Sequence, residues 1–184
     1  MSEPHPISPD VLKQARAYVR VDQARQALPV LEDAIRAFEP VPGPAGESVA
    51  KWLAKHAFHE PQEATVRLRL SYGKVTGVYA LCTAQIVLDT IERAQLGGVR
   101  YRTQPAILLA QFARSADAPG TGKELLRHAT GIARRARTYV GATVLVVDPF
   151  DEPTAEMWRE HFGFRDSQQP VPGKSQLQRQ WLSL

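Results

Sequence analysis

The stretch DAPGTGKELL, residues 117 to 126, contains the residue types that bind an anion. Pro119 to Lys123 reproduces the middle of a Walker A motif, which cradles the phosphates of a nucleoside triphosphate. The first glycine of that motif is replaced by Asp117 and its magnesium-binding hydroxyl by Glu124. Only about sixty residues follow, too few for the further βα units of such a fold. The sequence therefore argues against an ATPase and leaves a glycine-containing turn that enters a helix, which favours anion binding.

Three carboxylates form a second group that could do chemistry. Asp148, Asp151 and Glu152 follow a buried apolar run, at a place where a substrate amine could bind. Capping of a helix that begins near Pro153 explains Asp151 equally well. Both interpretations stay open at the level of sequence.

The histidines predict no metal site. His56 and His59 lie near Glu60, but no further ligand motif accompanies them, so we interpret them as a solvated helix end. His128 and His161 each stand beside apolar faces, which is typical of packing or surface groups.

Composition limits the class of protein. The chain has 184 residues, 43% hydrophobic and 23% charged, as expected for a globular domain. A single cysteine, Cys82, excludes an internal disulfide and predicts a buried, reduced thiol. Neither an export signal nor an apolar run long enough for a membrane span is visible, so we expect a cytoplasmic protein without membrane contact. The net charge of +4 permits contact with nucleic acid or acidic ligands.

The N-terminal part predicts helices. One apolar stripe at helical spacing contains Val21, Ala24, Leu28, Leu31, Ile35 and Phe38. Pro29 divides this region into two helices, and the turn-rich stretch from Glu39 to Gly46 is a linker. A short helix with Trp52 in its core-facing stripe follows at residues 49 to 56. We expect residues 1 to 45 to form a helical extension and linker, and residues 46 to 184 one compact domain.

The remainder alternates strands and helices. Strict alternation over residues 65 to 72 predicts a half-buried strand. Gly73 and Lys74 predict a turn after it, and residues 75 to 88 predict its antiparallel partner strand. A short helix over residues 89 to 98 and a buried strand over residues 105 to 113 come next. The helix of residues 123 to 139 then leads to a second buried strand over residues 142 to 148, which we expect to be parallel to the first. A helix over residues 154 to 161 and a strand over residues 176 to 182 close the chain.

The helix after the loop has two faces. Its predicted core stripe contains Leu125, Ala129, Ile132 and Ala136. Its arginines, Arg127, Arg134, Arg135 and Arg137, lie largely outside that stripe, where they are either solvated or in contact with RNA phosphates. The order of elements predicts an α/β fold with a mixed sheet, in which an antiparallel hairpin and central parallel strands are flanked by helices.

These stretches resemble a known family. PAILLAQFARSADAPGTGKELL, ATVLVVD and AEMWREHFGF together are similar to the GNAT acyl-CoA N-acyltransferases, most of all to the branch that contains tRNA-acetylating toxins. The resemblance spans Gly46 to Leu184. It implies a GNAT fold, acetyl-CoA as co-substrate and an amine acceptor that is aminoacyl-tRNA or a small molecule. A homodimer is an expectation that the resemblance does not supply.

The same resemblance implies where coenzyme A binds. Residues 117 to 122 stand at the family's R/Q-x-x-G-x-G/A motif, with Asp117 in place of the usual Arg or Gln. The pyrophosphate would bind Ala118, Gly120, Thr121 and Gly122, where free helix amides and the macrodipole favour an anion, and Lys123 would add positive charge. The backbone of Phe112, Ala113 and Arg114 would hold the pantetheine arm and the thioester carbonyl.

The resemblance also implies an acid in the last helix. Many relatives carry a tyrosine there, within the pattern A-x-x-F-Y-x-x-x-G-F, and we assign Trp158 to that position. Because indole is no practical acid, water or another hydroxyl would protonate the leaving thiolate.

Three functions remain open. The first is an acetyl-CoA-dependent N-acetyltransferase, which acts by direct attack of a primary amine in a ternary complex. The second is a catalytically silent acyl-CoA-binding module, suggested by Trp158 and Asp117. The third is a protein-interaction role of the helices between Pro9 and Phe38.

Overall fold

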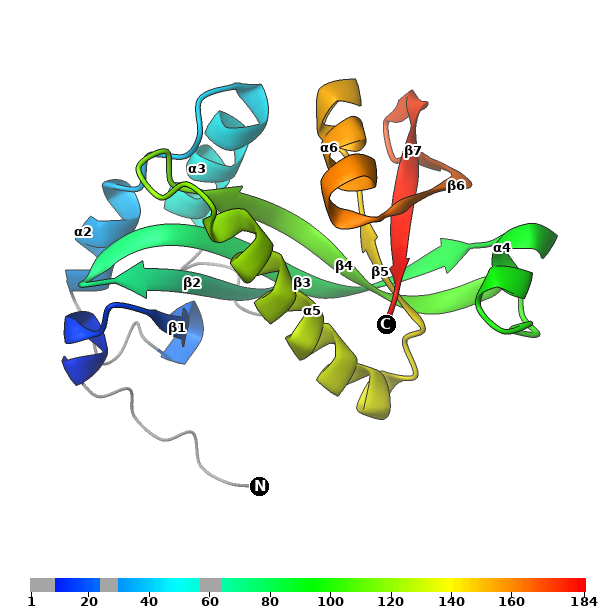
Figure 1. The fold of residues 1–184 in the computed structure, drawn as a ribbon, viewed down its shortest axis with the longest axis horizontal. Helices are drawn as coiled ribbons and strands as arrows, with labels where there is room; N and C mark the ends of the chain where they lie inside the picture. Colours follow the sequence, from blue (N-terminus) through cyan, green and yellow to red (C-terminus); the bar gives the residue numbers. More distant parts are fainter. Residues whose placement is uncertain (1–8, 24–29, 57–63) are drawn as a thin grey trace. The chain divides into compact units, whose positions relative to one another are not determined.

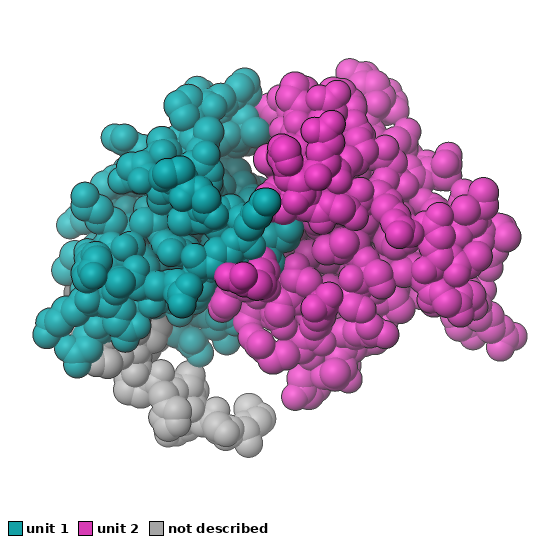
Figure 2. Space-filling view, viewed as in Figure 1, with its two compact units in different colours: residues 1–80, 111–126 teal, residues 81–110, 127–184 magenta. Residues whose placement is uncertain are grey.

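The computed structural model describes residues 9–23, 30–56 and 64–184. The chain divides into two compact units, shown in different colours in Figure 2. Unit 1 contains residues 1–80 and 111–126, and unit 2 contains residues 81–110 and 127–184. The strands follow the order β1-β2-β3-β4-β5-β7-β6 (Figure 1). Strands β3 and β4 and helix α5 each contribute residues to both units. This mixed α/β architecture confirms the predicted fold class.

Unit 1 holds the N-terminal elements. They are the 3₁₀ helix η1 (Pro9–Lys13), strand β1 (Ala17–Arg20), helix α2 (Val30–Arg36), helix α3 (Pro44–His56) and strand β2 (Thr65–Ser71). The first residues of β3 (Lys74–Val87), the end of β4 (Thr103–Arg114) and the first turns of α5 (Thr121–Val140) complete it. Helix α3 therefore begins inside the predicted linker, because Pro44 suits a helix start as well as a turn.

Strand β1 is a finding that the sequence pattern does not predict. It pairs antiparallel with β2 at the edge of the sheet, so that Val19 lies opposite Leu68 and Tyr18 opposite Arg69. Because side chains alternate along a strand, the valine and leucine enter the core of unit 1 while the tyrosine and arginine share the other face. The predicted alternation of β2 is thus correct. The polar side chains of β2 share one face of the sheet with the polar side chains of β1.

The core of unit 1 uses the predicted apolar stripe. Val21, Leu31, Ile35 and Phe38 are all buried, and they pack with Leu53 of α3 and with β2. Ala24 and Leu28 lie outside the described residues. The β2–β3 turn has two successive residues in the left-handed region, Tyr72 at φ 47° and Gly73 at φ 80°, as a tight hairpin requires.

Unit 2 contains α4 (Thr90–Gln95), β5 (Val144–Val147), α6 (Glu152–Phe162), β6 (Arg165–Val171) and β7 (Lys174–Ser183). Strand β5 pairs parallel with β4, as predicted, and antiparallel with β7. Strand β6 pairs with β7 along the other edge of β7, with irregular register around Pro170. The polar sequence of β6, RDSQQPV, predicts no strand, and it forms one because β7 supplies hydrogen-bond partners.

The buried stripe of α5 differs from the prediction in its second half. Leu125, Ala129 and Ala133 are fully buried, whereas Ile132 and Ala136 are only partly buried. The predicted outer face is correct, since Arg127, Arg134, Arg135 and Arg137 are all exposed. The shift by one residue follows from the 3.6-residue period, which over several turns moves the stripe around the helix.

Candidate functional site

The loop from Ser115 to Gly120 joins β4 to α5 within unit 1. The Ser115 N–H donates to the Thr76 carbonyl at 3.0 Å, and the Ala118 N–H donates to the Ser115 carbonyl at 3.3 Å. The Thr121 hydroxyl donates to the Ala118 carbonyl at 2.8 Å, which closes the turn before the helix. Gly120 has φ 80°, a conformation that favours glycine. The loop is therefore a tight, internally bonded turn that leads directly into the amides of the first turn of α5.

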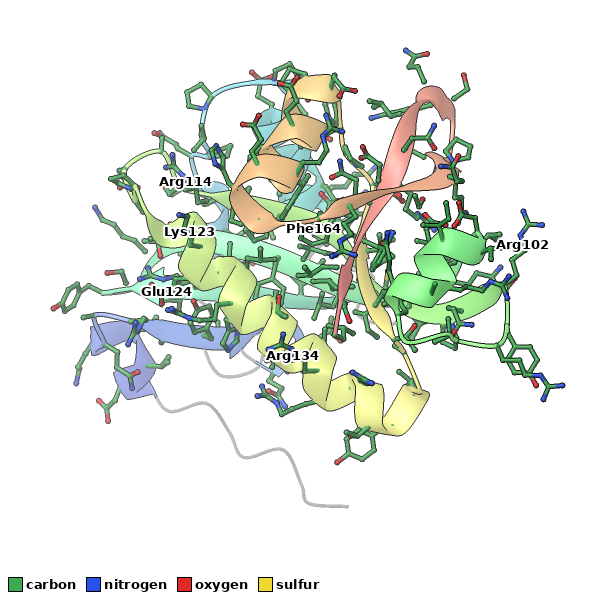
Figure 3. The ribbon with its side chains drawn as sticks, turned by 45° about the vertical axis from the view of Figure 1, so that its right-hand side comes forward. Arg102, Arg114, Lys123, Glu124, Arg134 and Phe164 are labelled. Atoms are coloured by element: carbon green, nitrogen blue, oxygen red, sulfur yellow. The ribbon has the colours of Figure 1, made fainter. Side chains whose placement is uncertain are left out.

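Positive charge surrounds this helix start. Lys123 is exposed in the first turn, and Arg114 lies beside Gly122, where a Cβ would stand 3.9 Å from the Arg114 Cδ. Figure 3 labels Arg114 and Lys123 at the start of α5. The first amides of a helix lack intrahelical acceptors and carry partial positive charge. Anion binding at this turn therefore stays a prediction, which the exposed helix start and these two cations favour.

The Asp117 side chain is hydrogen-bonded within the loop. The Ser115 hydroxyl lies within hydrogen-bond distance of the Asp117 carboxylate and, at 3.0 Å, of the Glu39 carbonyl, and its one proton is donated to either acceptor. The Asp117 side chain therefore stabilises the loop from an exposed position.

A second carboxylate, Glu124, is neutralised by residues of the N-terminal strands. Its Oε1 accepts from the Tyr18 hydroxyl at 3.2 Å and from Arg16 Nη1 at 3.3 Å, and its Oε2 accepts from Arg69 Nη2 at 3.1 Å. Burial raises the pKa of Glu124, but the hydrogen bond and charge of Arg69, the Tyr18 hydroxyl and Arg16 together hold it below its ordinary value. The charged carboxylate of Glu124 therefore points toward the sheet (Figure 3).

The backbone of β4 alternates between two sides at its end. In an antiparallel ladder the N–H and C=O of one residue point to the same side, and those of the next residue to the other. Since Ser115 bonds to β3, Ala113 also faces β3, and Phe112 and Arg114 face away. The Arg114 carbonyl accepts the Val41 N–H at 3.1 Å. Of the three residues predicted to bind pantetheine, Ala113 thus faces β3, whereas Phe112 and Arg114 face the other side.

In unit 2 the pairing between β4 and β5 is short. It runs from Ala106 with Val144 to Leu108 with Val146, while β4 itself continues to Arg114. The carboxyl end of this parallel pair is where ligands of open α/β sheets bind.

Trp158 is buried in unit 2. Its side chain is 5% exposed, and its ring packs against Phe162 and Phe164 at centroid distances of 5.1 Å. Counted from Ala155 or back from Gly163, the pattern A-x-x-F-Y-x-x-x-G-F has its Phe at Trp158 and its Tyr at Arg159. The burial of Trp158 and its position in the pattern both indicate a core aromatic residue. The tyrosine position of the pattern is Arg159.

Arg159 stands on the outer side of α6. Its Nη2 donates to Glu152 at 2.6 Å and its Nη1 to both oxygens of Asp166 at 3.1 and 3.2 Å. The hydrogen bond to Glu152 raises the pKa of Arg159 further, with Asp166 adding to the effect, so the guanidinium stays charged.

Within the described ranges no group of three His, Cys, Asp or Glu side chains could hold a metal ion, and His56 stacks on Trp52. His59 and Glu60 lie outside those ranges. No helix in the part of the chain that the structure describes is long and apolar enough to cross a membrane.

Comparison with known proteins defines the class of the fold. No protein-family model and no curated protein matches the sequence. Solved structures match over almost the whole chain, and these are toxins with the fold of the GNAT N-acetyltransferases. This protein therefore has the GNAT fold, and the predicted resemblance is confirmed.

The particular structures share little sequence with it. AtaT complexed with acetyl-methionyl-tRNAfMet is 15% identical, with a TM-score of 0.69 over 91% of this chain and 94% of that chain. A tyrosine-to-phenylalanine mutant of AtaT, bound to acetyl-CoA and to the C-terminus of the antitoxin AtaR, is 16% identical, with a TM-score of 0.64 over 91% and 92%. A tyrosine-to-phenylalanine mutant of KacT is 16% identical, with a TM-score of 0.70 over 92% and 95%.

Proposed function

We propose that this protein is an acetyl-CoA-dependent N-acetyltransferase. The observation that carries the proposal is the turn between β4 and α5, which presents helix amides, Arg114 and Lys123 in a GNAT fold. Both nearby carboxylates accept hydrogen bonds from the protein, Asp117 from Ser115 and Glu124 from Arg69. The charge of Glu124 is thereby offset by Arg69, and Arg114 and Lys123 supply the positive charge that a pyrophosphate would meet.

The residues that would hold acetyl-CoA are those predicted from the sequence, except Ala113, which faces β3, and Ala118 and Thr121, whose N–H groups donate within the turn. The amides of Gly120, Gly122 and Lys123 would bind the pyrophosphate, and the outward backbone groups of Phe112 and the N–H of Arg114 would bind the pantetheine arm. An amide directed at the thioester carbonyl would stabilise the oxyanion that forms when an amine attacks. The N–C bond forms, the C–S bond breaks, and the proton that the amine loses is matched by one gained by the thiolate.

For the acceptor we propose aminoacyl-tRNA. The AtaT structure with acetyl-methionyl-tRNAfMet supports this choice, as do the net charge of +4 and the exposed arginines of α5. Phosphate contacts by such arginines supply most of the non-specific affinity for nucleic acids.

Water would protonate the thiolate, since neither Trp158 nor Arg159 can serve as the acid. Trp158 is buried and Arg159 stays charged through Glu152 and Asp166. This arrangement also favours the second candidate function, an acyl-CoA-binding module without turnover.

One experiment separates these functions. Calorimetric titration with acetyl-CoA is followed by a thiol-release assay with methionyl-tRNA and a panel of small amines. We expect binding and thiol release for the wild type, and loss of binding in Gly122→Glu, because the added carboxylate repels the pyrophosphate. Gly131→Glu, the same change at an open position of α5, is the control and should bind normally. Binding without release would support the silent module, and no binding would contradict both.

A further inference from the structure

A group of arginines gathers around α4 within unit 2. We call it the α4 surface, and it contains the half-buried Arg93, the exposed Arg100, Arg102 and Arg165, and the exposed Tyr101. Figure 3 labels Arg102, which stands just before β4. None of the four arginines forms an ion pair with a carboxylate of the described residues. The α4 surface therefore carries positive charge without a paired counter-charge.

Hydrogen bonds to neutral groups hold two of these arginines against α4. Arg93 Nη1 donates to the Arg100 carbonyl and Arg93 Nε to the Asp89 carbonyl, both at 3.2 Å. Arg165 Nη1 donates at 2.8 Å to Oε1 of Gln95, the last residue of α4. Because these acceptors are uncharged, the bonds position the guanidinium groups and leave their charge in place.

The carboxylates that neighbour these arginines in the chain have other partners. Asp89 and Glu92 form the capping box of α4, and Glu92 is buried and also accepts the Gln168 N–H at 3.2 Å. Asp166 pairs with Arg159 of α6. None of these acidic side chains pairs with an arginine of the α4 surface.

An exposed aromatic ring lies among the cations. Tyr101 is 68% exposed, and the Arg100 guanidinium lies over its ring, with Cζ 5.6 Å from the ring centroid. Arg102 follows directly and is also exposed. Unpaired nucleobases stack on aromatic rings and guanidinium planes of this kind, while neighbouring cations contact the phosphates. The α4 surface therefore has both the charge and the ring that single-stranded nucleic acid requires.

A second copy of this chain fits the α4 surface poorly. In a two-fold symmetric dimer the same patch lies on both subunits, so the arginines of one protomer would meet those of its partner. Like charges placed opposite each other oppose association. A polyanion with accessible bases instead complements the arginines and the tyrosine together.

We propose that the α4 surface binds RNA, with its arginines on the phosphates and Tyr101 stacked on an unpaired base. The proposal rests on the tRNA acceptor proposed above and names a part of unit 2 that contacts it. Every base has a π-face, so stacking of this kind depends little on sequence. The α4 surface therefore recognises unpaired RNA, whatever its sequence.

The first test measures the charge. Binding of a short single-stranded RNA is followed by fluorescence anisotropy at several salt concentrations. Arg100→Ala combined with Arg102→Ala should reduce the slope of log K against log salt by about 1.4, since each phosphate contact to a single strand contributes about 0.7. The control, Arg20→Ala with Arg36→Ala, removes two arginines that already pair with carboxylates and should keep the wild-type slope.

The second test measures the stacking. Tyr101→Ala should weaken binding of the single-stranded RNA about fivefold or more, the loss expected when one base is no longer stacked. Tyr101→Phe should bind like the wild type, because stacking needs the ring and not the hydroxyl. Duplex RNA of the same length should bind the wild type and Tyr101→Ala equally, since its bases are already stacked. Tyr72→Ala, at a tyrosine of unit 1 with 71% exposure, is the control and should change neither affinity.

The outcomes separate this proposal from the tRNA acceptor. A wild type that binds tRNA, with both the Tyr101→Ala and the double arginine variant binding RNA equally well, would overturn this proposal alone. A wild type that binds no RNA would contradict the tRNA acceptor as well. Sedimentation of the double arginine variant tests a protein partner. Loss of a dimer at unchanged RNA affinity would assign the α4 surface to a second copy and overturn the proposal.

Discussion

Arg69 Nη2 donates to Glu124 Oε2 at 3.1 Å and thereby joins strand β2 to the first turn of α5. The side chains are 11% and 20% exposed, and Arg69 also donates to the Thr76 hydroxyl at 2.6 Å. Residues 55 positions apart in the chain thus connect the sheet to the proposed anion-binding turn.

Glu124→Gln should lower the free energy of unfolding by about 2 kcal/mol, because it leaves the largely buried Arg69 guanidinium without its counter-charge. Urea denaturation of both proteins measures the difference. Glu32→Gln, which breaks the exposed pair with Arg36, is the matched control and should cost less than about 0.5 kcal/mol. Equal effects of the two changes would contradict the structural role of Glu124.

Tyr18 should make stability fall at alkaline pH. Burial, then the charge of Glu124 and the hydrogen bond donated to it, raises the pKa of Tyr18 from 10.0 to about 12. The folded state therefore binds the phenolic proton more tightly than the unfolded state, and this contribution is complete below pH 10 and lost between pH 10 and 12.

Urea midpoints at about pH 9 and about pH 11.5 test this linkage. Tyr18→Phe should be less stable than the wild type at the lower pH, and the difference should shrink at the higher pH. Tyr139→Phe, at a side chain with 89% exposure, should follow the wild-type profile. A difference in urea midpoint between Tyr18→Phe and the wild type that does not change with pH would rule out the linkage.

Asp151→Ala should destabilise the protein by about 1 kcal/mol through loss of the N-cap of α6. The hydrogen bonds from Thr154, first that of its hydroxyl, lower the pKa of Asp151, so this stabilisation is present above the ordinary value of 3.8 and is lost as the pH falls through the lowered value. Thermal unfolding at neutral and acidic pH measures both effects. A loss of stability in Asp151→Ala that is the same at acidic and neutral pH would show that the cap does not need the ionised carboxylate.

Arg159→Tyr should raise kcat by about tenfold or more, since a general acid typically contributes 10²–10⁴-fold and Arg159 occupies the tyrosine position of the pattern. Trp158→Tyr should give no such gain and should lower stability, because the indole is buried between Phe162 and Phe164. Thiol release and urea denaturation of the two variants distinguish them. A gain in Trp158→Tyr alone would restore Trp158 as the tyrosine position.

Arg134→Ala combined with Arg135→Ala should weaken tRNA binding and reduce the slope of log K against log salt by about 1 to 2, as expected when one or two phosphate contacts are lost. Acetyl-CoA binding should not change. Filter binding at several salt concentrations measures the slope, with Arg36→Ala on α2 as the control. An unchanged slope would place the RNA contact elsewhere.

The local pattern predicts most of the elements that carry the candidate site. Strand β2, the hairpin turn, the buried run of β4 and helix α5 follow from period-2 alternation, glycine positions and period-3.6 spacing, all of which are properties of neighbouring residues. The parallel pairing of β4 with β5 also follows, because a helix separates them.

Strands β1 and β6 do not follow from the local pattern. The first has four residues, and the second is polar and contains Pro170. Such segments become strands only because a neighbouring strand completes their hydrogen bonds, and no neighbour in the chain indicates this.

The sequence by itself therefore determines the order of most elements and the glycine turn before α5. Only the tertiary structure decides which charges are paired. Glu124 meets Arg69, and Asp148 meets Arg179 31 positions later in the chain. The same structure buries Trp158 and leaves Arg159 outside. The physical reason is that ion pairing and burial depend on distances in space, which the fold sets between residues that no local period connects.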